Sequence, residues 1–227
     1  MSVIKGSLAS WRRCFPLATA ASLSEGHKTV TDTDLVLLRG IRKLEMRDCK
    51  QITDAGIAHL RSIQEFFMDG CTLITDAGLA HLRGIQALGM GGCKAITDAG
   101  LAHLRGIREL WMGGCTGVTD AAMEHLRGIY ELHVEYCPQL TDAALAPLAG
   151  IHTLEMRFCT SITNAAMVHL RGIRSLDIRG CPQISDEALE QLEGANIQRD
   201  EPDEQEEGES NDSEEESEEG EPNAGDE

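Results

Sequence analysis

A cysteine recurs every 22 residues along most of this chain, and this spacing constrains the fold more than any other feature. Around each cysteine the chain repeats a unit of the form Gly-Ile-x-x-Leu-x-Met-x-x-Cys-x-x-Ile-Thr-Asp-Ala-Gly-Leu-x-His-Leu-Arg. A group that occurs once in every unit is expected to be structural, because a catalytic group is needed only once. The series runs without a slip through Cys49, Cys71, Cys93, Cys115, Cys137, Cys159 and Cys181.

The fourth repeat shows how each unit should fold. Leu110 and Met112 alternate with other residues, so both side chains point to one face of a short strand. Thr119 and Asp120 can cap a short helix, whose first N–H groups lack partners within the helix. Gly128 can adopt the left-handed conformation that ends this helix. Each unit is therefore predicted to be a strand, a turn, a short helix and a second turn.

No single unit of this kind can bury its apolar face, so stability must come from stacking against neighbouring units. A period of this length with the pattern L-x-x-L-x-L-x-x-N/C-x-L is the signature of leucine-rich repeats. We therefore predict an α/β fold, a leucine-rich-repeat solenoid shaped as a horseshoe arc. Parallel strands should line the concave face and short helices the convex face.

Three segments are expected along the chain. An N-terminal segment or cap covers residues 1–28, and the solenoid covers 29–197 as a half-repeat followed by seven full repeats. Residues 198–227 are acidic and poor in apolar side chains, so this tail is predicted to be disordered. The first segment has three basic residues and no acidic residue before Glu25, as in an organelle transit peptide. Its short apolar stretch is also similar to a weak secretory signal.

The repeated cysteines are predicted to form a buried structural ladder. Cys115 follows the last inward strand residue by three positions, where a small side chain with a weak S–H donor can bond the exposed backbone. A cytosolic chain would keep such thiols reduced. The cysteines form no CxxC pair or mixed Cys/His pair, and a histidine ladder should lie on the solvated convex side with nothing to fix its geometry. We therefore expect no metal and no cofactor. The histidines concerned are His59, His81, His103, His125 and His169.

A cysteine followed by Ile-Thr-Asp-Ala-Gly-Leu, as in Cys93–Leu101, resembles the cysteine-containing class of leucine-rich repeats. That class is best known in the substrate-binding domains of F-box proteins, the receptors of cullin-type ubiquitin ligases. The resemblance implies a non-enzymatic recognition module, a substrate receptor of a ubiquitin ligase, with a cullin-ligase adaptor among its partners. The unit here is shorter than is usual in that class, and no F-box is recognisable in the N-terminal segment.

Outward strand positions are free to bind another protein. One column of them runs through Glu45, Phe67, Gly89, Trp111, His133, Glu155 and Asp177. Exposed aromatic residues and arginine are the usual anchors of protein interfaces. We predict a partner-binding face formed by Phe67, Trp111, His133, Tyr136, Arg157, Phe158 and Arg179. In the alternative, Tyr136 and Phe158 pack sideways at a turn and Trp111 lies flat on bare glycines.

The charge of the chain is unevenly distributed. The formal net charge is −18, yet residues 200–227 hold 16 of the 38 acidic residues and no Lys or Arg, which leaves 22 acidic and 20 basic residues elsewhere. A nearly neutral body without clustered Lys and Arg argues against nucleic acid as a ligand. The repeats followed by an acidic tail support an alternative function: a nuclear regulator that binds basic proteins such as histones, or a small GTPase.

Other classes are disfavoured by what the sequence lacks. No nucleophile–base pair or carboxylate pair stands out from the repeat, so we expect no enzymatic activity. No apolar run reaches the roughly 18 residues that a membrane span needs. A monomeric protein of the cytoplasm or nucleus that binds a protein partner is therefore the expectation.

Overall fold

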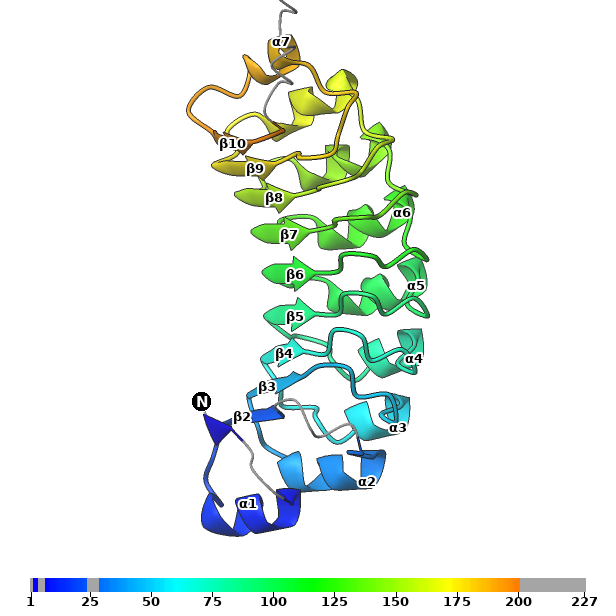
Figure 1. Cartoon of the computed structure of the whole chain (residues 1–227), viewed down its shortest axis with the longest axis vertical. Helices are drawn as coiled ribbons and strands as arrows, with labels where there is room; N and C mark the ends of the chain where they lie inside the picture. The colour runs from blue at the N-terminus through cyan, green and yellow to red at the C-terminus, as the bar shows by residue number, and fades with distance from the viewer. Residues whose placement is uncertain (1, 4–6, 24–28, 201–227) are drawn as a thin grey trace, which may run out of the picture.

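The computed structural model describes residues 2–3, 7–23 and 29–200. In this part of the chain, ten parallel strands form one sheet whose spatial order is the order of the sequence. Figure 1 shows the strands stacked along the concave side of a gentle arc. They are β1 (Ser2–Val3), β2 (Ala20–Leu23), β3 (Lys43–Met46), β4 (Glu65–Phe67), β5 (Ala87–Gly89), β6 (Glu109–Trp111), β7 (Glu131–His133), β8 (Thr153–Glu155), β9 (Ser175–Asp177) and β10 (Asn196–Gln198).

Short helices follow the strands; the first lies at the N-terminal end of the stack, and the later ones line the convex side (Figure 1). The α-helices are α1 (Leu8–Cys14), α2 (Asp32–Leu35), α3 (Asp54–Ile57), α4 (Asp76–Leu79), α5 (Asp98–Leu101), α6 (Asp120–Met123) and α7 (Asp186–Leu189). The 3₁₀ helices are η1 (Val36–Leu38), η2 (Ala102–Leu104), η3 (Glu124–Leu126), η4 (Asp142–Ala144), η5 (Ala146–Leu148) and η6 (Asn164–Leu170). The predicted architecture, with parallel strands on the concave face and short helices on the convex face, is confirmed.

One apolar core runs through the stack between the sheet and the helices. In the fourth repeat, Leu110 and Met112 point into it from the strand, and Met123 and Leu126 point into it from the helices. Thr119 caps α6 by accepting a hydrogen bond from the N–H of Ala121. Each repeat thus buries apolar side chains from both layers, and stacking removes them from water.

Successive repeats are joined by a polar clamp that the sequence analysis did not predict. The carboxylate of the first helical residue accepts two hydrogen bonds from the capping threonine of the next repeat. One comes from the backbone N–H and the other from the hydroxyl, as from Thr75 to Asp54 at 2.8 and 2.7 Å. Asp32–Thr53, Asp54–Thr75, Asp76–Thr97, Asp98–Thr119, Asp120–Thr141 and Asp142–Thr163 all pair in this way. In the last pair Asn164 accepts from the backbone N–H of Ser185, and its own Nδ2 donates to the serine oxygen.

The seven repeated cysteines are buried, and Cys115 has no exposed surface. The Sγ of Cys115 donates to the backbone carbonyl of Met90 in the preceding repeat, at 3.3 Å. Five further cysteines make the corresponding bond, at 3.2 to 3.7 Å. The thiols therefore satisfy backbone carbonyls between repeats, while Cys14, which lies outside the series, is exposed.

The ends of the stack differ from the expected segments. Strand β2 gives the expected half-repeat a strand of its own, and Ala21 pairs with Leu44, an offset of 23 residues. At the other end Leu176 pairs with Ile197, an offset of 21 residues. Strand β10 continues to Gln198, one residue past the expected end of the solenoid. Residues 201–227 of the predicted tail lie outside the described residues.

In the N-terminal segment, α1 buries Trp11 against the end of the core, and the guanidinium of Arg12 donates to the carbonyls of Ala18 and Arg39. These contacts tie the segment to the first repeat. Among the described residues, no helix has the length and apolar character needed to cross a membrane.

Candidate partner-binding face on the concave sheet

The middle column of outward residues crosses six neighbouring strands in register. Phe67 on β4 pairs with Gly89 on β5, and Gly89 pairs with Trp111 on β6. The column continues through His133 on β7, Glu155 on β8 and Asp177 on β9. Because adjacent strands lie about 4.8 Å apart, side chains in one column can contact each other directly. The regular stack therefore aligns in one column residues that are 22 positions apart in the sequence.

Phe67 and Trp111 meet across the bare strand position of Gly89. Their ring centroids lie 5.4 Å apart at an interplanar angle of 46°, a tilted aromatic contact. A Cβ on Gly89 would lie 2.8 Å from Cδ1 of Phe67, so a side chain there would push this ring away. On its other side Trp111 contacts the ring of His133, with centroids 5.4 Å apart. Trp111 is thus held between two rings and is half-buried.

Tyr136 and Phe158 lie at the turns that follow β7 and β8. Their rings are stacked, with centroids 4.5 Å apart and an angle of 13° between planes, yet they remain 59% and 44% exposed. Both residues have a left-handed backbone, with φ of 56° and 59°. That conformation is strained for a bulky side chain, and strain of this kind is concentrated at functional sites. Of the other repeats, four have glycine at the same turn position, and the first has Asp48, whose φ is also 56°; the glycines are Gly70, Gly92, Gly114 and Gly180.

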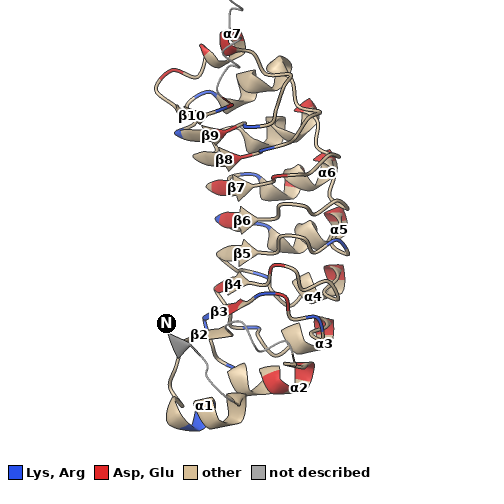
Figure 2. Cartoon of the chain, in the orientation of Figure 1, with Lys and Arg blue, Asp and Glu red and all other residues tan. Residues whose placement is uncertain are grey.

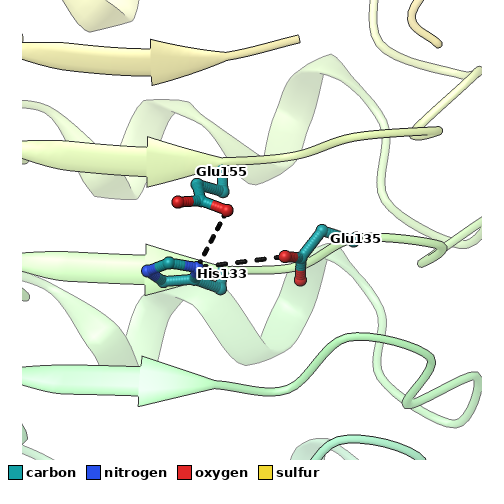
Figure 3. A group of neighbouring side chains, drawn as sticks. All are labelled: His133, Glu135 and Glu155. Atoms are coloured by element: carbon teal, nitrogen blue, oxygen red, sulfur yellow. Dashed lines mark ion pairs between the residues drawn. The ribbon is translucent and has the colours of Figure 1, made fainter. Parts of the chain in front are cut away.

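His133 is only 9% exposed and is surrounded by carboxylates. Its Nε2 lies 2.8 Å from Glu131. Its Nδ1 lies 3.2 Å from Glu155 and 3.9 Å from Glu135 (Figure 3). Burial acts to lower the pKa of His133, but the nearby carboxylates outweigh it and raise this pKa above its ordinary value. Burial acts to raise the pKa of Glu135, yet the hydrogen bonds from His133 and Arg157 lower it to about 2.

Both predicted arginine anchors are already paired with acidic side chains. Nη2 of Arg157 lies 2.9 Å from Glu135 and 3.2 Å from Glu155. Arg179 forms two hydrogen bonds to Asp177, at 2.6 and 3.0 Å. The acidic partners of these arginines were missed as site residues by the sequence analysis, although Glu155 and Asp177 stand in the predicted outward column. The signal that could have found them was an acidic residue two positions before each arginine, which places both side chains on one face of the strand.

The strand face therefore has two parts. An aromatic ridge consists of Phe67, Trp111 and the ring of His133. An acid-rich cluster beside it consists of Glu131, His133, Glu135, Glu155, Arg157, Asp177 and Arg179. Figure 2 shows charged residues on β6 and β7 and none on β5. The aromatic ridge can supply hydrophobic contacts to a partner, and the acid-rich cluster can supply charge recognition.

The repeat, the parallel sheet and the one-sided helices define a leucine-rich-repeat solenoid. No protein-family model and no curated protein matches the sequence. Several solved structures share the fold. They include Rad7 in its complex with Elc1 in yeast (19% identity, TM-score 0.54) and internalin C2 from Listeria monocytogenes (23% identity, TM-score 0.57). TLR13 in its complex with ssRNA13 also matches (13% identity, TM-score 0.60).

These matches cover most of this chain but different shares of the other proteins. They cover 78% of this chain and 46% of the Rad7 chain, and 79% of this chain and 32% of the TLR13 chain. The match to internalin C2 covers 74% of each chain. The chain thus spans less than half the length of two of these proteins. At these identities the similarity establishes the fold.

Proposed function

We propose that this chain is a non-enzymatic recognition module that binds a protein partner on its concave strand face. The observation that carries the proposal is the pair Tyr136 and Phe158. Each has a strained backbone at a position where four other repeats have glycine, and each still exposes a large part of its ring. Folding alone would favour glycine at both positions. Binding of another molecule accounts for the retention of two exposed aromatic side chains there.

The aromatic ridge supplies the central anchor in this proposal. Trp111 is fixed between Phe67 and His133, so little side-chain entropy would be lost when a partner covers it. The arginines are held by neighbouring acids and can present their remaining N–H groups to a partner. The proposed contact residues are Phe67, Trp111, His133, Tyr136, Arg157, Phe158 and Arg179.

The partner we favour belongs to the ubiquitin-ligase pathway, with the chain acting as a substrate receptor. The support is the cysteine-containing form of the repeat, together with the shared fold of Rad7 in its complex with Elc1. This function would place the protein in the cytoplasm or nucleus and would include a cullin-ligase adaptor among its partners.

A basic partner is the second candidate, and one observation favours it. The acid-rich cluster contains four carboxylates against two arginines on β7 to β9 and the residues that follow these strands. A negative surface attracts and orients basic proteins. Histones, or a small GTPase with a basic patch, would fit this surface, and the acidic C-terminal residues would add to the attraction.

The test is affinity capture of purified candidate partners by the full chain and by its Trp111→Ala variant. Cullin-ligase adaptor, a small GTPase and histones would be offered separately. Loss of a central aromatic anchor should weaken capture by ~2 kcal/mol or more, which is about thirtyfold. Val168→Ala is the control variant. Val168 is exposed on the helical side of the stack, so this variant should capture the partner as the wild type does.

Thermal unfolding of each variant separates binding from folding. The Trp111→Ala variant should unfold close to the wild-type temperature, because this side chain lies outside the core. Capture of a partner with equal affinity by wild type and Trp111→Ala would remove the ridge from the proposal. Recovery of histones or GTPase without adaptor would favour the second candidate.

A further inference from the structure

We propose that His133, Glu135 and Glu155 form a binding site for a divalent transition-metal ion such as Zn²⁺. One ligand atom from each residue lies within 4.8 Å of the others (Figure 3). The Nδ1 of His133 is 3.2 Å from Glu155 and 3.9 Å from Glu135. Donor atoms around a tetrahedral Zn²⁺ are about 3.3 Å apart, since each is about 2.0–2.1 Å from the metal. Small side-chain rotations would therefore suffice to bind the ion.

The repeat geometry fixes these three side chains on one surface. His133 and Glu155 are register partners at the ends of β7 and β8. Glu135 follows His133 by two residues, and Figure 3 shows its carboxylate turned toward the imidazole. Because the stack holds both strands rigidly, the ligands are positioned before any ion binds.

Glu131 provides an independent indication that the imidazole is arranged for metal binding. Its carboxylate lies 2.8 Å from Nε2 of His133 and accepts a hydrogen bond from that nitrogen. This bond leaves Nδ1 directed at the other two carboxylates. Metal-binding histidines in proteins almost always have such a partner on the second nitrogen, which fixes the ring and increases its basicity.

Arg157 shows that this position attracts a cation. Its Nη2 bonds to the same two oxygen atoms that would bind the ion, Oε1 of Glu135 and Oε2 of Glu155. Its Nε lies 3.6 Å from Asp177, so the guanidinium has a second acidic partner when an ion displaces it. Arg157 is thus a competitor of the metal, and removing it should increase metal affinity.

One nitrogen and two carboxylate ligands favour Zn²⁺, Co²⁺ or a similar ion over Mg²⁺ and Ca²⁺, which prefer oxygen ligands alone. This inference departs from the expectation of no metal site, which considered only the cysteines and the convex histidines. It does not depend on the proposed partner, because metal binding is measured on the isolated protein.

The experiment is a Co²⁺ and Zn²⁺ titration of the full chain, followed by absorbance and calorimetry. A Cys14→Ser background removes the one exposed thiol among the described residues. One ion should bind per chain, and its Co²⁺ spectrum should lack the near-ultraviolet band of thiolate ligands. His133→Gln and Glu155→Gln should each weaken binding roughly tenfold or more, and Glu131→Gln should weaken it by about 10- to 100-fold.

Two variants sharpen the test. Arg157→Gln should bind the ion more tightly than wild type, a result that a merely structural cluster would not give. His103→Gln, on the convex side, should bind like wild type. The proposal is overturned if neither wild type nor Arg157→Gln binds Co²⁺ at millimolar concentration. It is equally overturned if binding persists unchanged in both His133→Gln and Glu155→Gln, since the ion would then be held elsewhere. Circular dichroism of each variant verifies that it is folded.

Discussion

The carboxylate of Asp98 accepts two hydrogen bonds from Thr119 of the following repeat, one from the backbone N–H and one from the hydroxyl, each 2.7 Å long. The same threonine oxygen accepts a bond from the N–H of Ala121. Thr119 therefore caps its own helix while it binds the helix before it. A chain of such pairs along the convex side couples each repeat to the next.

Replacing Asp98 by alanine should lower the free energy of unfolding by about 2–3 kcal/mol, because a backbone N–H and a hydroxyl both lose a charged acceptor. Urea unfolding followed by circular dichroism would measure the change. Asp98→Asn should cost less, since Asn164 makes the corresponding pair with Ser185 in the native stack.

Asp186 offers a matched control, because it occupies the same helical position in α7 and pairs with Arg199 rather than with a following threonine. Asp186→Ala removes a surface ion pair and should cost about 1 kcal/mol or less. Equal losses for Asp98→Ala and Asp186→Ala would show that the clamp between repeats adds nothing to stability.

At position 136 glycine should give a more stable protein than alanine. Both changes remove the stacked ring, but alanine retains the left-handed backbone, which costs an L-residue roughly 1–2 kcal/mol. The difference in unfolding free energy between Tyr136→Gly and Tyr136→Ala should be about 1 kcal/mol. Gly114→Ala tests the same conformation in a repeat without the ring, and it should be destabilising; a stable Gly114→Ala would contradict this account.

Alkylation of the native protein should modify Cys14 and spare the seven repeated cysteines. Burial raises the pKa of Cys115 to about 12, against smaller opposing effects of backbone hydrogen bonds. At about pH 8 only on the order of one in ten thousand Cys115 thiols would be ionised, and only the thiolate reacts. Peptide mapping by mass spectrometry after iodoacetamide treatment would identify the modified cysteines. Modification of Cys115 at the rate of Cys14 would mean that the ladder opens in solution.

Asp177 should make stability depend on pH in the acid range. Burial acts to raise the pKa of Asp177, but Arg179 and Arg157 hold it below the ordinary value of 3.8. A folded pKa below the unfolded one stabilises the fold above pH 3.8, and this contribution is lost as the pH falls through the folded pKa.

The Asp177→Asn variant should therefore be clearly less stable than wild type at about pH 7, and the difference should shrink by about pH 3. Urea unfolding at the two pH values measures it. A difference that stays constant between them would mean that the carboxylate is not preferentially stabilised in the folded state.

Much of the fold was predictable from the sequence because every unit carries the same information. Strand positions followed from the alternation at Leu110 and Met112, and the helix start followed from Thr119 and Asp120. The terminal strands β2 and β10 were missed because their units are 23 and 21 residues long in the register of the sheet. A search at a fixed spacing of 22 does not detect them.

The candidate site was predictable in part. The outward column follows from period-two alternation, so its members could be named. The partner that each side chain contacts could not be predicted, because Arg157 and His133 each have several acidic residues within reach. The left-handed backbone of Tyr136 could not be predicted either. The glycines at the equivalent turns indicate this conformation, but the sequence does not show that tyrosine adopts it.

Gly89 limits where repeats can be inserted into this array or removed from it. Phe67 and Trp111 touch only because the one strand between them has no side chain at that position. A unit duplicated or deleted between them would separate the two rings or force them together. Three consecutive units consequently form an indivisible block, and changes in length are compatible with this surface only when they occur on either side of it.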